Sequence, residues 1–227
     1  MKLKHRLATV VGLAVGLAGV ALVPIAAAGD PQPATPAQAQ ALISAPSPVM
    51  SGSTSRTVSA QEAFAAASLP GATVSIAPGL SLVQAVGLSP AGSISTGAAA
   101  STSTSSPVVK PIGTTLAATA CSSNAQWTEW GLWPYQQRIT DTTYWCAVYG
   151  DHITYTSSTT NGSGTLCSTG WTSSQTISGG IGYSWFVNRA SAGFSCPTAV
   201  PWLSLHPSHN QDTSRNAWGS TQLVGTS

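Results

Sequence analysis

Every tryptophan, tyrosine and cysteine of this 227-residue chain lies from Cys121 onward, and Phe64 is the only aromatic residue before that point. Lysine has the opposite distribution, because none follows Lys110. Large aromatic side chains and disulfides are what a small domain uses to build a stable core. The partition predicts three regions: a signal peptide over residues 1–28, an Ala/Ser/Thr/Pro-rich low-complexity tether over 29–118, and one disulfide-bonded domain over 119–227.

The first region has the order of segments that is typical of a secretory signal peptide. A basic start is followed by an apolar stretch over residues 7–23, then by Pro24 and three alanines that end at Ala28. A retained membrane anchor is the alternative, but the stretch falls short of the about 20 apolar residues that a spanning helix needs. The pattern favours cleavage and secretion into the extracellular space, with no stable membrane anchor afterwards.

The second region is dominated by small residues and has few charges. Such a composition has too little apolar bulk to offset the entropy of ordering the chain. We therefore expect residues 29–118 to be disordered and largely unpacked. One short helix is expected inside it, because Ser59 and Glu62 have the spacing of an N-terminal capping box.

The four cysteines are widely spaced, whereas metal sites usually contain close cysteine pairs. In an exported chain they predict two disulfides. Four cysteines allow three pairings, which spacing alone does not separate. We predict the pairs Cys146–Cys167 and Cys121–Cys196, the second of which would tie an early strand to a late one.

Apolar and polar residues alternate through the third region, as in half-buried β-strands. The clearest examples are residues 144–149, which lead through a turn at Gly150 to residues 153–155, and residues 181–188. Glycine-rich turns are expected at 161–164 and 178–180, and a late strand over 200–205. Several short strands at this spacing predict an all-β fold, an antiparallel β-sandwich.

Four short segments carry a resemblance to a known group, and the first is residues 135–139, which read Tyr-Gln-Gln-Arg-Ile. Residues 144–154 contain the run Trp-Cys-Ala-Val-Tyr-Gly, and residues 193–196 and 201–203 read Gly-Phe-Ser-Cys and Pro-Trp-Leu. These segments resemble uncharacterised secreted β-domain proteins of high-GC Gram-positive bacteria. The chain departs from their pattern around Phe194 and at Val200. The resemblance implies the fold and secretion, and it implies no activity.

Eight tryptophans are many for a domain of this size, and aromatic rings both fill cores and anchor interfaces. Because aliphatic residues are scarce, we expect Trp145, Trp185 and Trp202 to fill the core. Four others lie near turn residues and are the expected binding residues on the surface: Trp130, Trp133, Trp171 and Trp218.

Groups that could carry catalysis are few in the third region. His206, His209 and Asp212 are spaced by three and are weak candidates for a metal site, since imidazole and carboxylate both suit zinc. Their surroundings read as a polar loop, so no metal and no cofactor is expected. Glu129 lies between two tryptophans and is the most suggestive carboxylate for a glycosidase, which needs a facing second carboxylate.

These observations predict a secreted, non-enzymatic extracellular module that binds a cell-wall glycan or a protein, or is structural. A secreted hydrolase such as a glycosidase is the alternative, and a bacteriocin-like factor is the third reading. No catalytic residue is assigned. Carbohydrate or an extracellular protein is the expected partner, and nucleic acid is not, because the third region carries no cluster of cationic residues.

Overall fold

A computed structural model describes residues 32–44, 48–88 and 119–227. The described residues all belong to one compact unit, Pro31–Ser227. The signal peptide expected over residues 1–28 lies outside the described part of the chain. Within that part, no helix is long and apolar enough to cross a membrane.

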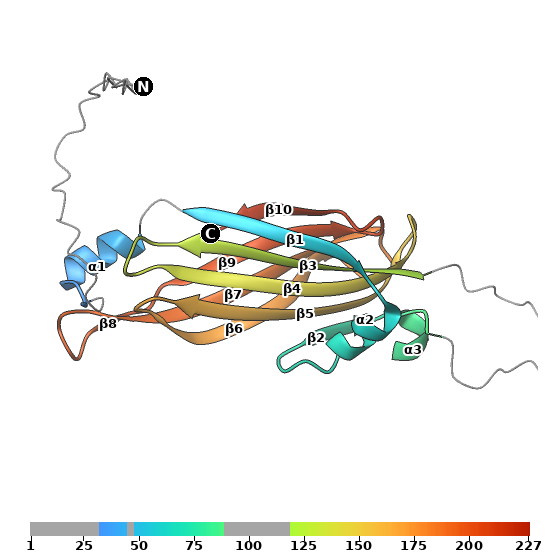
Figure 1. The fold of residues 1–227 in the computed structure, drawn as a ribbon, viewed down its shortest axis with the longest axis horizontal. Helices are drawn as coiled ribbons and strands as arrows, with labels where there is room; N and C mark the ends of the chain where they lie inside the picture. Colours follow the sequence, from blue (N-terminus) through green and yellow to red (C-terminus); the bar gives the residue numbers. More distant parts are fainter. Residues whose placement is uncertain (1–31, 45–47, 89–118) are drawn as a thin grey trace, which may run out of the picture. The chain divides into compact units, whose positions relative to one another are not determined.

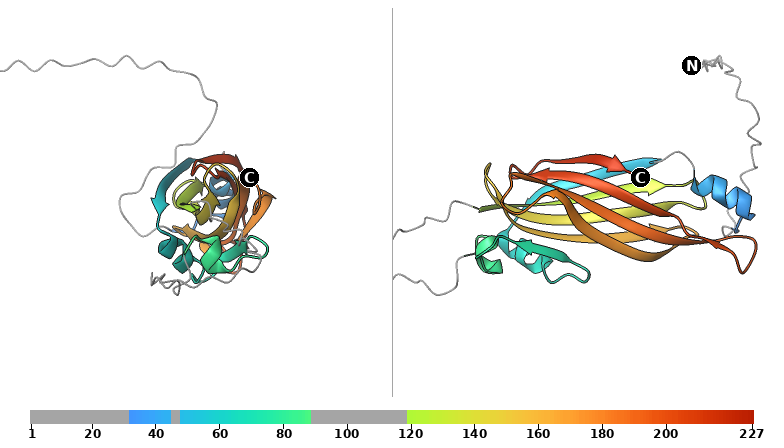
Figure 2. Two further views of the ribbon diagram at one scale, coloured as in Figure 1. Left: turned by 90° about the vertical axis from the view of Figure 1, so that its right-hand side faces the viewer. Right: turned by 180° about the vertical axis from the view of Figure 1, so that it is seen from behind.

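Two antiparallel sheets face each other, which confirms the predicted β-sandwich (Figures 1 and 2). The front sheet has the strand order β1-β3-β4-β5-β2, and the back sheet has the order β10-β9-β7-β6 with β8 paired to β7. The strands of the front sheet are β1 (Met50–Val58), β2 (Thr73–Ile76), β3 (Thr119–Trp130), β4 (Gln137–Val148) and β5 (Ile153–Gly164). Those of the back sheet are β6 (Ser168–Gly179), β7 (Trp185–Pro197), β8 (Ser204–Leu205), β9 (Ser208–Asn216) and β10 (Thr221–Thr226).

The long strands follow the period-two pattern of the sequence. In β4, the buried residues Ile139, Asp141, Thr143 and Trp145 alternate with more exposed neighbours. This strand has 12 residues and therefore spans roughly 40 Å at the rise of an antiparallel strand. The predicted turn at Gly150 connects β4 to β5.

The described parts of the segment before the third region are folded, so the expectation that it is largely unpacked is wrong for residues 32–44 and 48–88. Strand β1 pairs with β3 along its whole length, from Met50 opposite Glu129 to Val58 opposite Cys121. Strand β2 pairs with residues 155–158 of β5. Backbone hydrogen bonds to a sheet edge do not depend on large apolar side chains, which is why the composition gave no sign of this pairing.

Three helices complete the N-terminal part: α1 (Pro36–Ile43), α2 (Ala60–Ala66) and α3 (Leu82–Ala85). Helix α2 begins at the predicted cap, where the Ser59 hydroxyl accepts a hydrogen bond from the Glu62 amide at 3.1 Å. Helices α2 and α3 pack their alanines on the outer face of the front sheet, next to Cys121, Cys146 and Tyr155. Small side chains permit this close packing of a helix on a sheet.

All four cysteines form disulfides, as expected, but the predicted pairing is wrong. The bridges are Cys121–Cys146 and Cys167–Cys196. Cys121 and Cys146 lie directly opposite each other in the register of β3 and β4, with their Cα atoms 4.0 Å apart. The register of one hairpin therefore decides this bridge.

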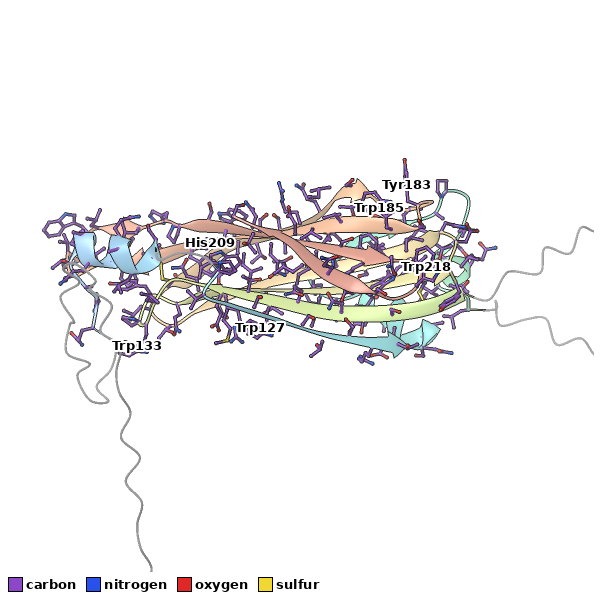
Figure 3. The ribbon with its side chains drawn as sticks, turned by 90° about the horizontal axis from the view of Figure 1, so that it is seen from above. Trp127, Trp133, Tyr183, Trp185, His209 and Trp218 are labelled. Carbon is purple, nitrogen blue, oxygen red and sulfur yellow. A yellow bond between two sulfur atoms is a disulfide. The ribbon has the colours of Figure 1, made fainter. Side chains whose placement is uncertain are left out.

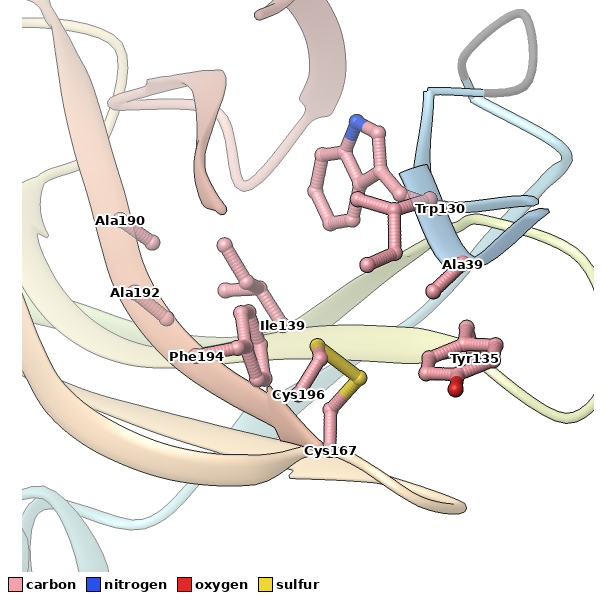
Figure 4. Close-up of a cluster of buried hydrophobic side chains, with 10 residues drawn as sticks. Ala39, Trp130, Tyr135, Ile139, Cys167, Ala190, Ala192, Phe194 and Cys196 are labelled. Carbon is pink, nitrogen blue, oxygen red and sulfur yellow. A yellow bond between two sulfur atoms is a disulfide. The ribbon is translucent and has the colours of Figure 1, made fainter. Parts of the chain in front are cut away.

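Apolar residues fill both ends of the sandwich, and polar residues fill its middle. At one end, a cluster around Trp130, Tyr135 and Phe194 is closed by α1 (Figure 4). Between the two ends, the fully buried Asp141 and Arg215 form an ion pair at 2.8 Å. Burial lowers the pKa of Arg215, and Asp141 opposes that effect.

Three local expectations differ from the structure. The turn expected at 161–164 is the end of β5, and the loop expected around His209 is part of β9. The late strand is reduced to Ser204–Leu205, and Trp202 lies in the turn before it. In each segment the pairing partner, rather than local composition, decides the conformation.

Candidate binding surface

The four tryptophans expected on the surface do not form one site. Trp130 is fully buried and stacks on His209 with the ring centroids 4.7 Å apart, so its expected exposure is wrong. Trp133, Trp171 and Trp218 are each more than half exposed. However, Trp133 and Trp218 lie at opposite ends of the molecule (Figure 3), and Trp171 lies in the edge strand β6 against Gly193.

Two of the three tryptophans expected in the core are also misplaced. Trp145 is buried, whereas Trp185 is 41% exposed and Trp202 is 88% exposed. Trp185 begins β7, where its neighbour Phe186 occupies the inward position. The alternation of that strand therefore places Trp185 outside.

Four exposed aromatic residues come from three loops at the end of the sandwich opposite α1. We call them the loop surface: Tyr149, Tyr183, Trp185 and Trp218, which are between 41% and 67% exposed. Tyr149 follows β4, and Trp218 lies between β9 and β10. Tyr183 lies in the loop between β6 and β7, and Trp185 is the first residue of β7. Figure 3 shows Tyr183, Trp185 and Trp218 together at this end.

Backbone hydrogen bonds join the three loops to one another. The amide of Ile153 donates to the carbonyl of Tyr183 at 2.8 Å, and the amide of Ala217 donates to the carbonyl of Ser184 at 2.8 Å. The amide of Gly150 donates to the carbonyl of Ala217 at 3.4 Å. The backbone that carries the rings is therefore held by the neighbouring loops.

A buried cluster supports the loops from below. It consists of Trp145, Ala147, Ile153, Phe186 and Ala217. The Trp145 indole N–H donates to the carbonyl of Asn216 at 2.9 Å, and its ring contacts Phe186 edge-on with the centroids 6.2 Å apart. This packing fixes the base of the turn that carries Trp218.

Gly150 positions the Trp218 ring. It has a φ of 73°, a conformation that side chains other than glycine rarely adopt. A Cβ atom at this position would lie 3.1 Å from the indole nitrogen of Trp218. The ring therefore lies against the backbone of the β4–β5 turn.

The loop surface carries little charge. Residues 149–152, 180–185 and 217–220 contain no lysine or arginine, and Asp151 is their single carboxylate. The Asp151 carboxylate contacts Nδ1 of His152 at 3.0 Å. The surface therefore combines aromatic rings with hydroxyl and backbone groups, which suits an uncharged ligand.

The three weak metal candidates are separated by the strand that carries two of them. In β9, His209 lies toward the interior, and Asp212 is held outside by a two-bond contact with Arg189 at 2.8 and 2.7 Å. His206 is exposed before the strand. A spacing of three places two residues on opposite faces of a strand, although it would join them on a helix. The described residues contain no group of three His, Cys, Asp or Glu side chains placed to hold a metal ion.

His209 lies in an apolar environment. Burial lowers its pKa from 6.5 to about 4. Its Nε2 atom lies 2.8 Å from the Gln137 side-chain carbonyl, which can only accept. His209 is therefore neutral near pH 7 and donates this hydrogen bond.

Glu129 lies on the outer face of the front sheet and does not face a second carboxylate. The Nε atom of Arg138 donates to Glu129 at 2.8 Å, and the Arg138 guanidinium lies 4.7 Å from the centre of the Trp127 ring. A shallow cavity of about 240 Å³ adjoins this pair, and Glu129 is the one carboxylate that lines it. Hydrolysis by a carboxylate pair therefore has no geometric support at Glu129.

Sequence reasoning missed Tyr149, Tyr183 and Trp185 as surface residues. Tyr149 precedes Gly150, and Tyr183 follows Gly182, so both are aromatic residues beside a turn glycine with positive φ. The same signal correctly indicated Trp218, which precedes Gly219. The same signal, applied to tyrosine, would have predicted the exposure of Tyr149 and Tyr183.

The fold and the site define a disulfide-bonded antiparallel β-sandwich with an aromatic surface at one end. Two structural disulfides are typical of an extracellular or otherwise oxidising environment. No family model, no curated protein and no solved structure matches the chain.

Proposed function

We propose that the chain is a secreted extracellular module that binds a cell-wall glycan through the loop surface, without catalysing a reaction. The observation that carries this proposal is the gathering of Tyr149, Tyr183, Trp185 and Trp218 on three interlocked loops. The disulfides, the predicted signal peptide and the resemblance to secreted bacterial domains support the extracellular location.

A glycan suits this surface for two reasons. Sugar rings have apolar faces that pack against aromatic rings, and hydroxyl groups at their edges that need polar partners. The loops supply both, together with Asp151 and His152 at the margin. Rings on a rigid scaffold lose little conformational entropy when they bind, so a small surface is sufficient for recognition.

The proposal is tested by co-sedimentation with isolated bacterial cell wall and with insoluble polysaccharides. The chain from residue 29 is expected to bind, and the double variant Tyr183→Ala/Trp218→Ala to bind weakly. Each ring that anchors an interface contributes about 1–3 kcal/mol. The matched control is Trp133→Ala/Trp202→Ala, which removes two exposed rings at the opposite end and is expected to bind like the wild type.

The same samples distinguish binding from hydrolysis. The supernatant is assayed for released sugar, and none is expected. Release that persists in the wild type and is abolished by Glu129→Gln would replace the proposal with a hydrolase. Binding that survives deglycosylation of the wall but not removal of its proteins would replace the glycan with a protein partner.

A further inference from the structure

We propose that the end of the sandwich closed by α1 is a lipid-contacting surface, which places the folded unit reversibly on the outer leaflet of the membrane. We call it the α1-end surface: Leu132, Trp133, Trp202 and Leu203. It lies opposite the loop surface, and its role is independent of glycan binding.

Two loops carry this surface, and both are bonded to the α1 segment. In the β3–β4 turn, the amide of Leu132 donates to the carbonyl of Leu42 at 2.9 Å. In the β7–β8 loop, the amide of Ala199 donates to the carbonyl of Ala34 at 2.7 Å. Segments that are far apart in the sequence are therefore joined at the same end of the molecule, as Figure 1 shows.

The Tyr135 hydroxyl connects the same segments from inside. It accepts a hydrogen bond from the amide of Ala34 at 2.7 Å and donates one to the carbonyl of Pro197 at 2.9 Å. Tyr135 belongs to the same buried cluster as Ala39 and the Cys167–Cys196 bridge (Figure 4). The loops that carry the exposed side chains are therefore held in place by buried contacts.

Large apolar side chains at this end of the sandwich face solvent. Trp202 is the most exposed of the large apolar side chains in the described part of the chain, at 88%, and Trp133 is 57% exposed. Leu132 and Leu203, their neighbours in sequence, are 45% and 40% exposed. Single exposed apolar side chains are normal on a monomer, whereas several large ones gathered at one end are typical of an interaction site.

Charge is absent from the segments that build this end. Residues 32–44, 131–136 and 197–207 contain no Asp, Glu, Lys or Arg, and His206 is their one titratable group besides Tyr135. A surface of tryptophan and leucine without charges matches the boundary between lipid headgroups and acyl chains, where tryptophan concentrates. Recognition of an acidic or basic protein would require charged side chains here.

The path of the chain favours the membrane as the occupant. The apolar stretch over residues 7–23 precedes the folded unit, and the first described residue, Gln32, lies at the α1 end. The eight residues from 24 to 31 span at most about 28 Å when fully extended. Until the signal peptide is cleaved, a bilayer that holds the apolar stretch is therefore within reach of the α1 end.

Contact is expected to be weak and reversible after cleavage of the signal peptide. Four apolar side chains insert much less apolar area than a spanning helix or a lipid anchor does. Reversible contact of this kind does not amount to a stable membrane anchor. It would orient the loop surface away from the membrane, toward the cell wall.

The test is flotation of the chain from residue 29 with two kinds of vesicle, one of pure phosphatidylcholine and one in which phosphatidylglycerol replaces part of the phosphatidylcholine. Equal flotation with both is expected, because the surface carries no charge. Trp133→Ala/Trp202→Ala is expected to lower the partition coefficient about tenfold. The matched control, Tyr183→Ala/Trp218→Ala, is expected to change it by less than about twofold. Near-ultraviolet circular dichroism checks that both variants are folded.

Three results would overturn the inference: no flotation of the wild type with either vesicle, an equal loss in both double variants, or flotation that requires the anionic lipid. Light scattering adds a fourth. If the wild type dimerises in solution and Trp133→Ala/Trp202→Ala does not, a second copy of the chain covers the α1-end surface instead of lipid.

Discussion

The two ends of the sandwich both expose aromatic rings, but their surroundings differ. At the loop surface, three loops are bonded to one another, and the rings lie beside turn glycines and the Asp151–His152 pair. At the α1-end surface, two loops are bonded to a segment from a distant part of the chain, and residues 32–44, 131–136 and 197–207 contain no Asp, Glu, Lys or Arg. Aromatic residues of the same type therefore have different surroundings within one fold, and counting tryptophans does not reveal their role.

The difference has a structural origin in the N-terminal segment. Residues 32–44 close one end of the sandwich and contribute Ala39 and Ile43 to its core. Among the described residues, the other end is closed by its own loops. Changes at each end are therefore expected to have separate consequences.

The largest effect is expected for Trp145→Ala, which removes the support of the loop surface. Trp145 is fully buried, so the change leaves a cavity and costs about 3–5 kcal/mol of the free energy of unfolding. It also removes the hydrogen bond to Asn216 below Trp218. The free energy of unfolding, measured with denaturant, and the affinity for cell wall are both expected to fall. Vesicle flotation is expected to persist under conditions in which the variant is still folded. Trp145→Phe retains most of the packing and is the control.

Removal of the Cys167–Cys196 bridge by serine substitution is expected to cost about 2–4 kcal/mol. This bridge lies in the core beneath α1, where the Gln137 amide contacts both sulfurs at 3.6 and 3.7 Å. The matched control is removal of Cys121–Cys146, because the two bridges close loops of similar sequence separation, 29 and 25. Hydrogen exchange is expected to rise in α1 only for the first variant. An equal rise of hydrogen exchange in α1 in both disulfide variants would contradict the expectation that changes at the two ends have separate consequences.

Acidification is expected to destabilise the folded state through His209, which stacks on Trp130 in the half of the sandwich closed by α1. Its pKa is about 4 in the folded state and 6.5 in the unfolded state, so the unfolded state binds more protons in this window. Stability is therefore complete above pH 6.5 and falls as the pH decreases toward 4. After allowance for its partial exposure, the loss is about 1–2 kcal/mol. His209→Phe is expected to reduce the slope of stability against pH in this range, and an unchanged slope would contradict the assignment.

The smallest effect on stability is expected for the exposed rings themselves. Trp133→Ala/Trp202→Ala and Tyr183→Ala/Trp218→Ala remove side chains that contribute little to the core, so each is expected to change the free energy of unfolding by less than about 1 kcal/mol. Thermal unfolding checks this. A loss of several kcal/mol in either variant would mean that the rings are structural.

Period-two patterning was sufficient to predict the fold class and the strands around Tyr144 and Tyr155. It could not predict β1, because this strand is held by backbone bonds to β3 and contributes only Val58 to the core. It could not predict the disulfides either, because the partner of Cys121 depends on the register of the hairpin formed by β3 and β4.

The binding residues were predictable only in part. Glycine or proline neighbours correctly indicated the exposure of Trp133 and Trp218. The predicted exposure of Trp130 was wrong, because this residue continues the inward-facing row of β3 that includes Thr128. Its stacking partner His209 comes from a strand far along the chain. Which rings share an end depends on three loops that meet only in the folded state.

The central claim is that the two aromatic ends contact different ligands, and the indole N–H signals of the eight tryptophans test it most directly. In a ¹H–¹⁵N spectrum, soluble cell-wall glycan is expected to shift the signals of Trp185 and Trp218, and phosphatidylcholine nanodiscs are expected to shift or broaden those of Trp133 and Trp202. The buried Trp130 and Trp145 are internal references. Shifts of the same signals by both ligands, or of none by either, would contradict the account.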